Sequence, residues 1–282
     1  MPHLLNGRPA EAIGLQDRGL QYGDGLFETV AVRQGRLEFW QAHLQRLQLG
    51  CQRLGIPAPE PELLLTEARQ LLEETREATV LKIMVTRGEG GRGYRGPVPA
   101  ACRPNRILSR HPWPDYPEHY ATQGVSARIC DTPLGINPAL AGLKHLNRLE
   151  QVMARNEWRD EGIYEGLMLD LEGHVVEGTM SNLFFVKDGR LHTPDVSRCG
   201  VAGITRAMIL ELARRDDIPV AIGQCSLADL EGAEELLISN ALIGIWPVNQ
   251  LGQRRYPVGA MTHQLMGALN RARCDHHSHE TA

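Results

Sequence analysis

Lysine is scarce in this sequence, and its few positions limit where an amine could do chemistry. Of the 30 lysine and arginine residues, only Lys82, Lys144 and Lys187 are lysines. Lys144 lies in NPALAGLKHLNRLEQ, where small and apolar residues precede it and a predicted helix begins soon after. Partial burial would lower the pKa of the amine, and a neutral amine can attack an aldehyde to form a Schiff base. A solvated lysine on a surface loop is the alternative, because lysine is rarely buried without a partner.

The other two lysines are weaker candidates for covalent chemistry. Lys82 alternates with Leu81 and Ile83 in a predicted strand, so we expect its side chain on the solvent face of that strand. Lys187 lies in VKDGR, a predicted hairpin turn that water should surround. The sequence therefore favours Lys144 as the reactive amine.

Glu177 is the candidate carboxylate. It follows two valines and precedes Gly178, so a strand should end there and the side chain could face an interior cavity. A carboxylate in such a position could keep a pyridine nitrogen protonated, and a protonated ring is an electron sink that stabilises a carbanion. The alternative is a glutamate in water at the end of a strand.

The segment GVAGITR could bind an anion. It provides a turn of small residues, and Thr205 is placed to start the helix predicted over ITRAMILELARR. Backbone N–H groups at the start of a helix are suited to phosphate. Arg46, in HLQRL, could add a bidentate guanidinium. The alternatives are a plain helix cap and a solvated arginine on an amphipathic helix.

The glycine-rich stretch GEGGRGYRG contains a G-x-G-x-x-G pattern at Gly88, Gly90 and Gly93. Prolines at 97 and 99 and the lack of a predicted helix deny this pattern the context of a nucleotide-binding fingerprint. HVVEG is not the HExxH motif, and the six cysteines form no CxxC pair. We therefore predict neither a metal site nor a disulfide framework.

The elements that must position these residues fall into two predicted domains. In the first, LFETVAV is a strand after the turn QYGDG, a hairpin with QG at its turn follows, and TVLKIMVTR is a second strand. Helices are predicted over residues 41–54 and over PELLLTEARQLLEET. Residues 88–104 are too rich in glycine and proline for regular structure. We expect a small α/β domain at residues 1–115, ending in the linker around HPWPDYPEH.

The remainder predicts a larger, β-rich domain at residues 116–272 and a disordered tail at 273–282. The fold class is therefore α+β. The predicted strands are GVSARIC, EELLISN and the hairpins GLMLD/HVVEG and NLFFV/RLHTP, and the predicted helices are NRLEQVMARNEW, ITRAMILELARR and GAMTHQLMGALNRAR.

The composition is that of a globular protein, with 42% hydrophobic and 23% charged residues and a net charge of -4. Acidic and basic residues are interspersed, so no basic field favours nucleic acid as a partner. The start, MPHLLNGRPAEAIG, does not resemble a signal peptide, and no run approaches the roughly 20 apolar residues of a membrane span. We expect a cytoplasmic protein with no membrane partner.

Seven motifs, in order along most of the chain, resemble the fold-type IV pyridoxal-phosphate enzymes, whose two-domain fold the branched-chain and D-amino-acid aminotransferases share. The resemblance implies pyridoxal 5′-phosphate as the cofactor, bound between a small and a large domain, and it implies a homodimer. The motifs are QYGDGLFET, HLQRLQLGCQRLGI, TRGEGGRGY, KHLNRLEQVMARNEW, EGLMLDLEGHVVEGTMSNLFFV, GVAGITR and ISNALIGIWPV.

The resemblance also implies roles for individual residues. Lys144 would bind the cofactor covalently and move protons, and Glu177 would pair with the pyridine nitrogen. Ala241 departs from the commoner family pattern, because it offers the phosphate only a backbone N–H where relatives often add a hydroxyl. The remaining cofactor-binding residues that the resemblance implies are Arg46, Gly203, Ile204, Thr205 and Asn240 at the phosphate, and Ser181 and Asn182 along the cofactor.

Within this family, KHLNRLEQV and GEGGRGY are most similar to the 4-amino-4-deoxychorismate lyases. That similarity implies a lyase that converts 4-amino-4-deoxychorismate to 4-aminobenzoate and pyruvate for folate biosynthesis. The substrate carries two carboxylates, so we expect Arg92 and Tyr94 on the glycine-rich loop to bind it. An aminotransferase acting on D-amino or branched-chain amino acids is one alternative, and a non-catalytic cofactor-binding protein is the other.

Overall fold

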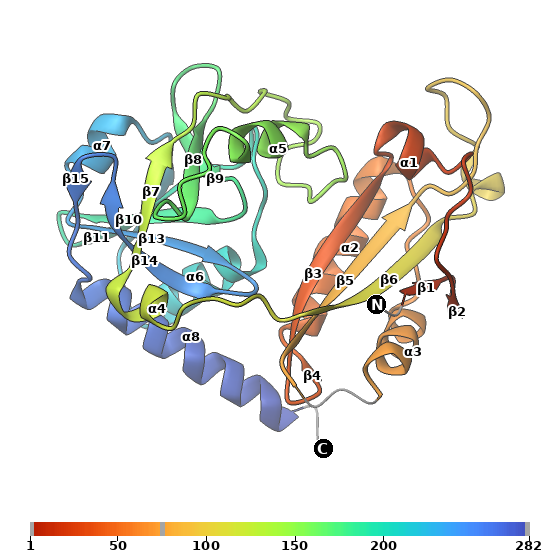
Figure 1. The fold of residues 1–282 in the computed structure, drawn as a ribbon, viewed down its shortest axis with the longest axis horizontal. Helices are drawn as coiled ribbons and strands as arrows, with labels where there is room; N and C mark the ends of the chain where they lie inside the picture. Colours follow the sequence, from red (N-terminus) through yellow and green to blue (C-terminus); the bar gives the residue numbers. More distant parts are fainter. Residues whose placement is uncertain (1–2, 74–76, 280–282) are drawn as a thin grey trace. The chain divides into compact units, whose positions relative to one another are not determined.

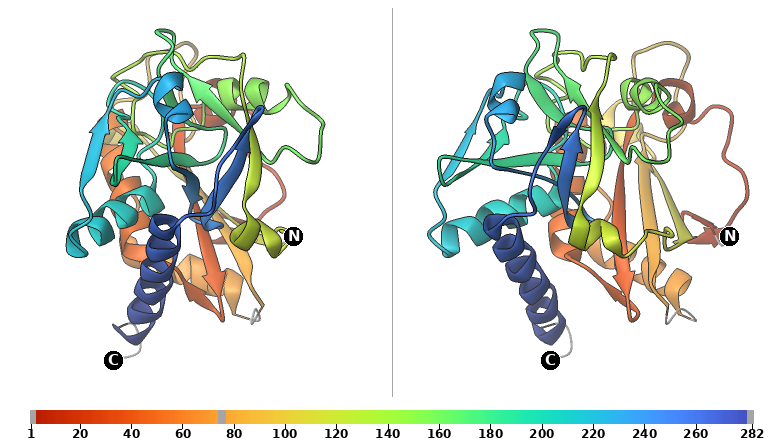
Figure 2. Two further views of the ribbon diagram at one scale, coloured as in Figure 1. Left: turned by 90° about the vertical axis from the view of Figure 1, so that its left-hand side faces the viewer. Right: turned by 60° about the vertical axis from the view of Figure 1, so that its left-hand side comes forward.

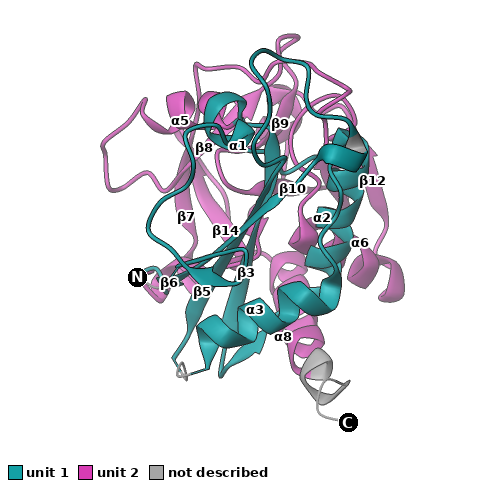
Figure 3. Ribbon diagram, turned by 90° about the vertical axis from the view of Figure 1, so that its right-hand side faces the viewer, with its two compact units in different colours: residues 1–114, 143–147 teal, residues 115–142, 148–282 magenta. Residues whose placement is uncertain are grey.

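The computed structural model describes residues 3–73 and 77–279, and the chain folds into two compact units. Unit 1 comprises Met1–Pro114 and Leu143–Asn147, and unit 2 comprises Asp115–Gly142 and Arg148–Ala282 (Figure 3). The chain thus leaves unit 2 for a short segment that contains Lys144 and then returns to it. No sequence pattern indicates this excursion, because the segment has neither the composition of a linker nor a change of hydrophobic period.

Unit 1 is built on an antiparallel sheet with the strand order β2-β1-β6-β5-β3-β4. Strands β3 and β5 confirm the predicted LFETVAV and TVLKIMVTR, and both residues of the predicted QG turn have positive φ, 53° at Gln34 and 76° at Gly35. Strand β6 was not expected, because its sequence runs into the proline-rich linker. The strands are β1 His3–Leu5, β2 Arg8–Pro9, β3 Gly25–Arg33, β4 Arg36–Leu37, β5 Thr79–Thr86 and β6 Asn105–Pro112.

In the described part of unit 1, the α-helices α1 Arg18–Tyr22, α2 Trp40–Leu54 and α3 Pro61–Leu72 accompany this sheet (Figure 1). A short 3₁₀ helix, η1 Pro99–Ala101, lies in the stretch for which no regular structure was predicted. Helix α2 packs against β3, and α3 packs against β6 and β1. Both longer helices confirm the sequence predictions. Helix α3 starts with Pro61, whose missing N–H costs no hydrogen bond there, and α2 ends at Gly55, which adopts φ 62°.

Unit 2 is a β-barrel with helices outside it. Strands β10, β13, β14, β7, β8 and β9 pair in that order, and β9 pairs back with β10 through Glu177 and Asn182, which closes the ring. Strands β11 and β12 extend the sheet beyond β10, and β15 pairs with β14. The strands are β7 Val125–Ile129, β8 Glu165–Leu169, β9 Val175–Gly178, β10 Asn182–Lys187, β11 Arg190–Pro194, β12 Val220–Gly223, β13 Glu235–Asn240, β14 Gly244–Leu251 and β15 Arg254–Arg255.

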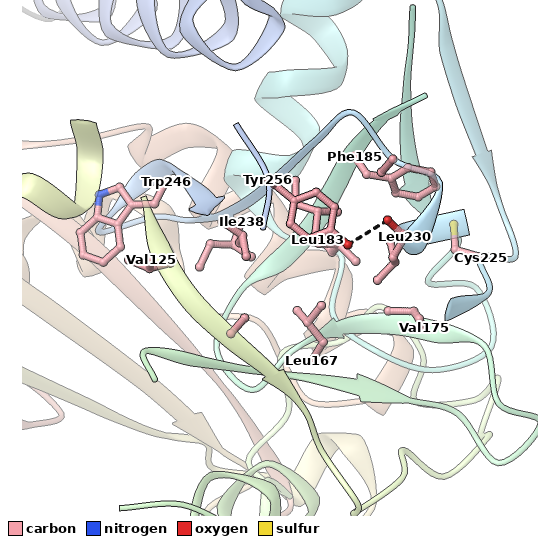
Figure 4. Packing of buried hydrophobic residues seen from close by; sticks show 14 of the residues in the cluster. Val125, Leu167, Val175, Leu183, Phe185, Cys225, Leu230, Ile238, Trp246 and Tyr256 are labelled. Atoms are coloured by element: carbon pink, nitrogen blue, oxygen red, sulfur yellow. Dashed lines mark hydrogen bonds between the residues drawn. The ribbon is translucent and has the colours of Figure 1, made fainter. Parts of the chain in front are cut away.

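Alternate residues of the barrel strands form one hydrophobic cluster (Figure 4). Leu183 lies opposite Ile238, and Phe185 lies opposite Leu236, so each pair buries its side chains across neighbouring strands. Tyr256 joins this cluster, and its hydroxyl donates to the carbonyl of Leu230 at 3.0 Å. The predicted β-rich second domain and the α+β class are confirmed.

Helices α6 Ile204–Arg215 and α8 Ala260–His279 pack against each other and against β13 (Figure 2). The sequence predicts a disordered tail at residues 273–282, of which 280–282 lie outside the described residues. Helix α8 continues through His279, since no glycine or proline after Gly267 interrupts it. The shorter helices are α4 His119–Gln123, α5 Leu149–Arg155 and α7 Leu227–Glu231. Among the described residues, every helix is too short or too polar to cross a membrane.

Truncating one barrel residue should reveal how much the closed ring contributes to stability. Leu183→Ala removes a fully buried side chain, so we expect the free energy of unfolding of unit 2 to fall by about 2–5 kcal/mol. Leu171→Ala, at a leucine that is 66% exposed, is the matched control and should change it by less than about 0.5 kcal/mol. Urea denaturation followed by tryptophan fluorescence measures both, and equal effects would contradict the assignment of this core.

Candidate functional site

Glu177 is a buried carboxylate of unit 2, one residue before the end of strand β9. It is 4% exposed and lies between Met168 of β8 and Asn182 of β10 in the barrel. Its Oε2 accepts a hydrogen bond from the backbone N–H of Val201 at 2.8 Å. Gly200 makes this approach possible, because it has φ 84° and a Cβ there would lie 3.2 Å from Oε2. The alternative of a solvated glutamate at a strand end is therefore excluded.

The start of helix α6 lies next to the same strands. The side-chain N–H of Asn182 donates to the carbonyl of Val201 at 2.9 Å. A Cβ on Gly203 would overlap Asn182 Oδ1, so only glycine fits at this helix start. Ile204 and Thr205 are buried in the first turn, which has neither a side-chain cap nor an acidic residue. This helix start is suited to an anion, because no side-chain carboxylate or hydroxyl of its own caps it.

The turn between β9 and β10 joins these residues to the end of β13. Ser181 is buried, and its hydroxyl donates to Glu165 Oε2 at 2.7 Å. The side-chain N–H of Asn240 donates to the carbonyl of Met180 at 3.2 Å, and Asn240 Oδ1 accepts from two N–H groups of its own turn. Ala241 follows Asn240 in that turn and can add only backbone groups.

Unit 2 thus brings together the residues of this unit that the sequence singled out. They supply a buried carboxylate, a helix start without a side-chain cap, and neutral hydroxyl and amide groups. This donor set fits a phosphorylated ring with a basic nitrogen, since the helix start suits the phosphate and the carboxylate suits the protonated nitrogen. The residues are Glu177, Ser181, Asn182, Gly203, Ile204, Thr205, Asn240 and Ala241.

Lys144 belongs to unit 1, where its segment pairs with the start of β3. The carbonyl of Lys144 accepts from the N–H of Phe27 at 2.9 Å, and the N–H of Leu146 donates to Gly25 at 3.0 Å. The Nζ of Lys144 lies 4.3 Å from the centre of the Phe27 ring. Backbone pairing therefore fixes the base of this partly buried side chain, and an aromatic face lies beside its amine.

Lys82 lies near the same aromatic ring, with its Nζ 5.6 Å from the ring centre. We expected this side chain on a solvent face, but it is only partly exposed, because Phe27 on the neighbouring strand covers part of it. Lys187, in contrast, pairs with Asp229 at 2.9 Å in unit 2, so its amine already has a carboxylate partner.

Arg46 lies on α2 and binds a buried carboxylate. Its Nε donates to Glu28 Oε1 at 2.8 Å and its Nη2 donates to Oε2, which also contacts His43 Nδ1 at 2.7 Å. Burial raises the pKa of Glu28, but the charge of Arg46 and the hydrogen bonds from Arg46 and His43 outweigh burial and lower the pKa to about 2. Arg46, with a side chain 13% exposed, is therefore not the solvated arginine of the alternative.

Arg92 and Tyr94 lie on the glycine-rich loop of unit 1, and both are exposed. Tyr94 is 91% exposed and contacts Tyr22 edge-on, with the ring centres 5.7 Å apart. The loop is anchored by Arg18, whose guanidinium donates to the carbonyls of Gly93 and Tyr94, each at 2.9 Å. The loop backbone is thus fixed at its centre, while the side chains beside the anchor extend toward solvent.

Asp24, in the QYGDG turn, orients that anchor. It accepts from Arg18 Nε at 2.9 Å and from Arg87 Nε at 2.7 Å. Partial burial raises the pKa of Asp24, but the hydrogen bonds and charges of Arg87 and Arg18 outweigh burial and leave the pKa below its ordinary value. The QYGDG motif therefore helps to hold the glycine-rich loop in place, because Asp24 forms ion pairs with Arg18 and Arg87.

Glu165, Glu28 and Arg18 hold the site residues through hydrogen bonds, although no sequence pattern singled them out. Glu165 and Glu28 could have been suspected, because each is an acidic residue in a mostly apolar strand. Arg18 carries no comparable signal, since the two loop carbonyls to which it donates lie 75 and 76 residues away in the chain.

A cluster of Asp170, Glu172 and His174 at the β8–β9 turn also has the composition of a cation site. Asp170 accepts from the N–H groups of Glu172 and His174, each at 2.9 Å, and Glu172 pairs with Arg198. These contacts account for the arrangement as a capped turn.

Comparison with known proteins gives a consistent result along the chain. The model of the family described as amino-transferase class IV matches residues 25–251. An aminodeoxychorismate lyase of Vibrio harveyi is 37% identical over 94% of this chain and 98% of its own length. A putative branched-chain-amino-acid aminotransferase of Methanocaldococcus jannaschii is 31% identical over 94% of both chains.

Among solved structures, 4-amino-4-deoxychorismate lyase from Pseudomonas aeruginosa superimposes with a TM-score of 0.91. It is 49% identical in sequence, and the match covers 95% of this chain and 98% of that chain. The expected two-domain fold-type IV architecture is confirmed by this likeness together with the family match.

Replacing Glu28 should change how stability depends on pH. Because folding lowers the pKa of Glu28 from 4.5 to about 2, its contribution is complete above about pH 5 and is lost as the pH falls toward 2. In Glu28→Gln this contribution, on the order of 3 kcal/mol, is absent, so wild type and variant should differ most at pH 7 and converge on acidification.

Chemical denaturation at a series of pH values measures the effect, with the exposed Glu60→Gln in the same unit as a control for the loss of one negative charge. A difference between wild type and Glu28→Gln that stays constant down to pH 2 would contradict the ion-pair assignment.

Proposed function

Since the chain belongs to the amino-transferase class IV family, we propose that it is a pyridoxal-phosphate-dependent lyase that converts 4-amino-4-deoxychorismate to 4-aminobenzoate and pyruvate. The observation that carries this choice of reaction is the high identity to two lyases over nearly the full length of the chain. The chemistry of the site residues supports the choice of cofactor.

The family resemblance supplies the residues that would hold pyridoxal 5′-phosphate. Lys144 provides the amine that binds it covalently, and Glu177 provides the carboxylate for its ring nitrogen. When bound, the cofactor supplies an electron sink for negative charge on the carbon that bears the substrate's amino group. The phosphate would be held by Arg46, Gly203, Ile204, Thr205, Asn240 and Ala241, and Ser181 and Asn182 would line the cofactor.

Glu177 holds a proton on the ring nitrogen in this proposal. Its buried carboxylate already accepts the Val201 N–H, and such a hydrogen bond stabilises the negative charge that the protonated nitrogen needs opposite it. A neutral side chain at this position would leave the nitrogen without a partner for its proton. Glu177 therefore governs the strength of the electron sink.

Lys144 moves the proton of the reaction. Its neutral Nζ takes the proton from the carbon that bears the amino group, and the bond between the neighbouring ring carbon and the enolpyruvyl oxygen then breaks. The electron pair from the C–H bond completes the aromatic ring of 4-aminobenzoate, while the released enolpyruvate takes up a proton on carbon to give pyruvate. Lys144 can return that proton, and aromatisation favours the forward direction.

We also propose that the enzyme acts as a homodimer in the cytoplasm. The resemblance to fold-type IV enzymes supports the dimer. All six cysteines are free thiols, five of them buried, which is the state that a reducing compartment maintains.

An aminotransferase is the second candidate, and the 31% identity to the putative branched-chain-amino-acid aminotransferase of Methanocaldococcus jannaschii favours it. In that case the same Lys144 would move a proton between two carbons, and a 2-oxo acid would take up the amino group. The discriminating product is pyridoxamine phosphate, which forms in the first half of a transamination and not in the lyase reaction.

Replacing Lys144 tests both the cofactor and the reaction. The purified wild-type protein should show the visible absorbance band of a lysine-bound cofactor and should form pyruvate and 4-aminobenzoate in equal amounts from aminodeoxychorismate. Lys144→Ala should lose the band and both products, whereas Lys187→Ala, which removes only the pair with Asp229, should keep them. A band that an amino acid converts to pyridoxamine phosphate, with no 4-aminobenzoate formed, would reject the lyase and support the aminotransferase.

Replacing Arg92 tests the substrate site on the glycine-rich loop. If its guanidinium binds a substrate carboxylate, Arg92→Ala should raise KM roughly tenfold or more while the cofactor spectrum stays unchanged. Arg95→Ala, at an exposed arginine of the same loop, is the matched control and should leave KM within about twofold. Steady-state assays of 4-aminobenzoate formation measure both, and an unchanged KM removes Arg92 from the site.

A further inference from the structure

Glu165 is a buried carboxyl group that the proposed reaction does not use, and burial raises its pKa above the ordinary value although its hydrogen bonds act in the opposite direction. It opens strand β8, is 0% exposed, and is followed by the apolar sequence GLML. Burying a carboxylate is unfavourable unless donors surround it, and such a group often contributes less to stability than an apolar side chain of its size. Its presence therefore calls for a role beyond packing.

The donors around Glu165 come almost entirely from one turn. Thr179 donates to Oε1 from its backbone N–H at 3.0 Å and from its hydroxyl at 2.6 Å. The hydroxyl of Ser181 donates to Oε2 at 2.7 Å, with the N–H of Met180 at 3.4 Å from the same atom. The remaining donor is the N–H of the next residue, Gly166, at 2.9 Å. One carboxylate thus binds all three residues of the β9–β10 turn.

That turn carries the cofactor-facing residues of unit 2. Glu177 lies two residues before it, Asn182 follows it, and Asn240 is hydrogen-bonded to its Met180 carbonyl. Gly178 allows the close approach, because a Cβ there would lie 2.7 Å from the Glu165 carboxyl carbon. A shift of the turn would therefore move the partner of the ring nitrogen and part of the phosphate site together.

We propose that Glu165 is a positioning residue for the cofactor site, which fixes the Thr179–Ser181 turn and thereby sets the placement of Glu177, Ser181 and Asn240. This inference rests on the proposed pyridoxal-phosphate function. It has one chemical consequence at Ser181: because that hydroxyl gives its single hydrogen to Glu165, it can meet a bound molecule only as a hydrogen-bond acceptor.

The barrel contains a second buried carboxylate, with similar donors, that connects a different pair of elements. Glu235 is also buried, and it accepts from the backbone N–H of Thr262 at 2.8 Å and from the Thr262 hydroxyl at 2.6 Å. Its other donor is the N–H of Met261 at 3.1 Å. These bonds tie the start of β13 to the first turn of α8. That turn carries none of the proposed site residues, and Asn240 lies at the opposite end of β13. Glu235 therefore reports what such a carboxylate does for stability alone.

The first experiment compares Glu165→Gln with Glu235→Gln in the full-length protein. Thermal unfolding without cofactor, the Kd for pyridoxal 5′-phosphate and the pH midpoint of the bound cofactor's absorbance change are measured for each. Both variants should lower the Tm, because each loses a charge-assisted hydrogen bond. Glu165→Gln alone should weaken cofactor binding roughly tenfold or more, which corresponds to about 1.4 kcal/mol. It alone should also shift the pH midpoint by about half a unit or more.

A second pair of variants, with smaller changes at the donors, tests the same proposal if Glu165→Gln does not fold. Thr179→Val and Thr262→Val each remove one hydroxyl donor to the respective carboxylate and retain the backbone N–H and the side-chain shape. Thr179→Val should raise the Kd for the cofactor about threefold or more, and Thr262→Val should leave it within about twofold, because one hydrogen bond contributes on the order of 1 kcal/mol.

The outcomes separate this inference from the proposed function. A wild-type protein that takes up no pyridoxal 5′-phosphate overturns both. If the wild-type protein binds it, equal changes of Kd and pH midpoint in the variants at the two carboxylates overturn only the positioning role. Glu165 is then a structural residue. Selective effects of Glu165→Gln and Thr179→Val, beyond their effects on Tm, support it.

Discussion

The cost of burying a carboxylate is the constraint on which the arrangement of both units depends. A buried carboxylate must collect several donors, so it fixes the elements that supply them. Glu28 ties β3 to α2 and so orients Arg46, Glu165 holds the β9–β10 turn, and Glu235 joins β13 to α8. Glu177 follows the same rule at the segment before α6, with the difference that in the proposed function its charge also serves the cofactor. Structural and functional carboxylates are thus held by the same kind of contact.

Glycines lie next to these carboxylates, because a backbone N–H can reach a buried oxygen only where no side chain intervenes. Gly178 lies against Glu165, and Gly200 lies against Glu177. Gly203 meets Asn182 at the start of α6, where any Cβ would overlap the amide oxygen. The glycines that a sequence-based view assigns to flexible turns therefore mark close contacts, and a methyl group at any of them would press against a neighbouring side chain rather than solvent.

Local patterns predicted most elements but not the way they combine. Apolar alternation was sufficient for β3 and β5, and helical spacing was sufficient for α2 and α6. Strand β14 was harder to foresee, because Pro247 lies in it; the proline is tolerated since pairing with β7 begins only at Val248. The composition of the site in unit 2 followed from the family motifs, whereas the Glu165 contacts depend on barrel closure, which joins residues through register rather than through any spacing in the chain. The excursion of Lys144 into unit 1 depends on backbone pairing with β3, for which a loop sequence carries no signal.

Whether the protein acts as a lyase or as an aminotransferase must depend on residues other than those that hold the cofactor. Lys144 and Glu177 would move a proton and sustain the electron sink in either reaction, so neither can select the bond that breaks next. That selection depends on groups that meet the substrate's ring, its carboxylates and its enolpyruvyl group. In unit 1 the glycine-rich loop has the construction such a task requires: Arg18 fixes its backbone at Gly93 and Tyr94, while the side chains beside that anchor remain exposed. If this loop binds the substrate, as proposed, its exposed side chains could differ between a lyase and an aminotransferase while its backbone stays fixed.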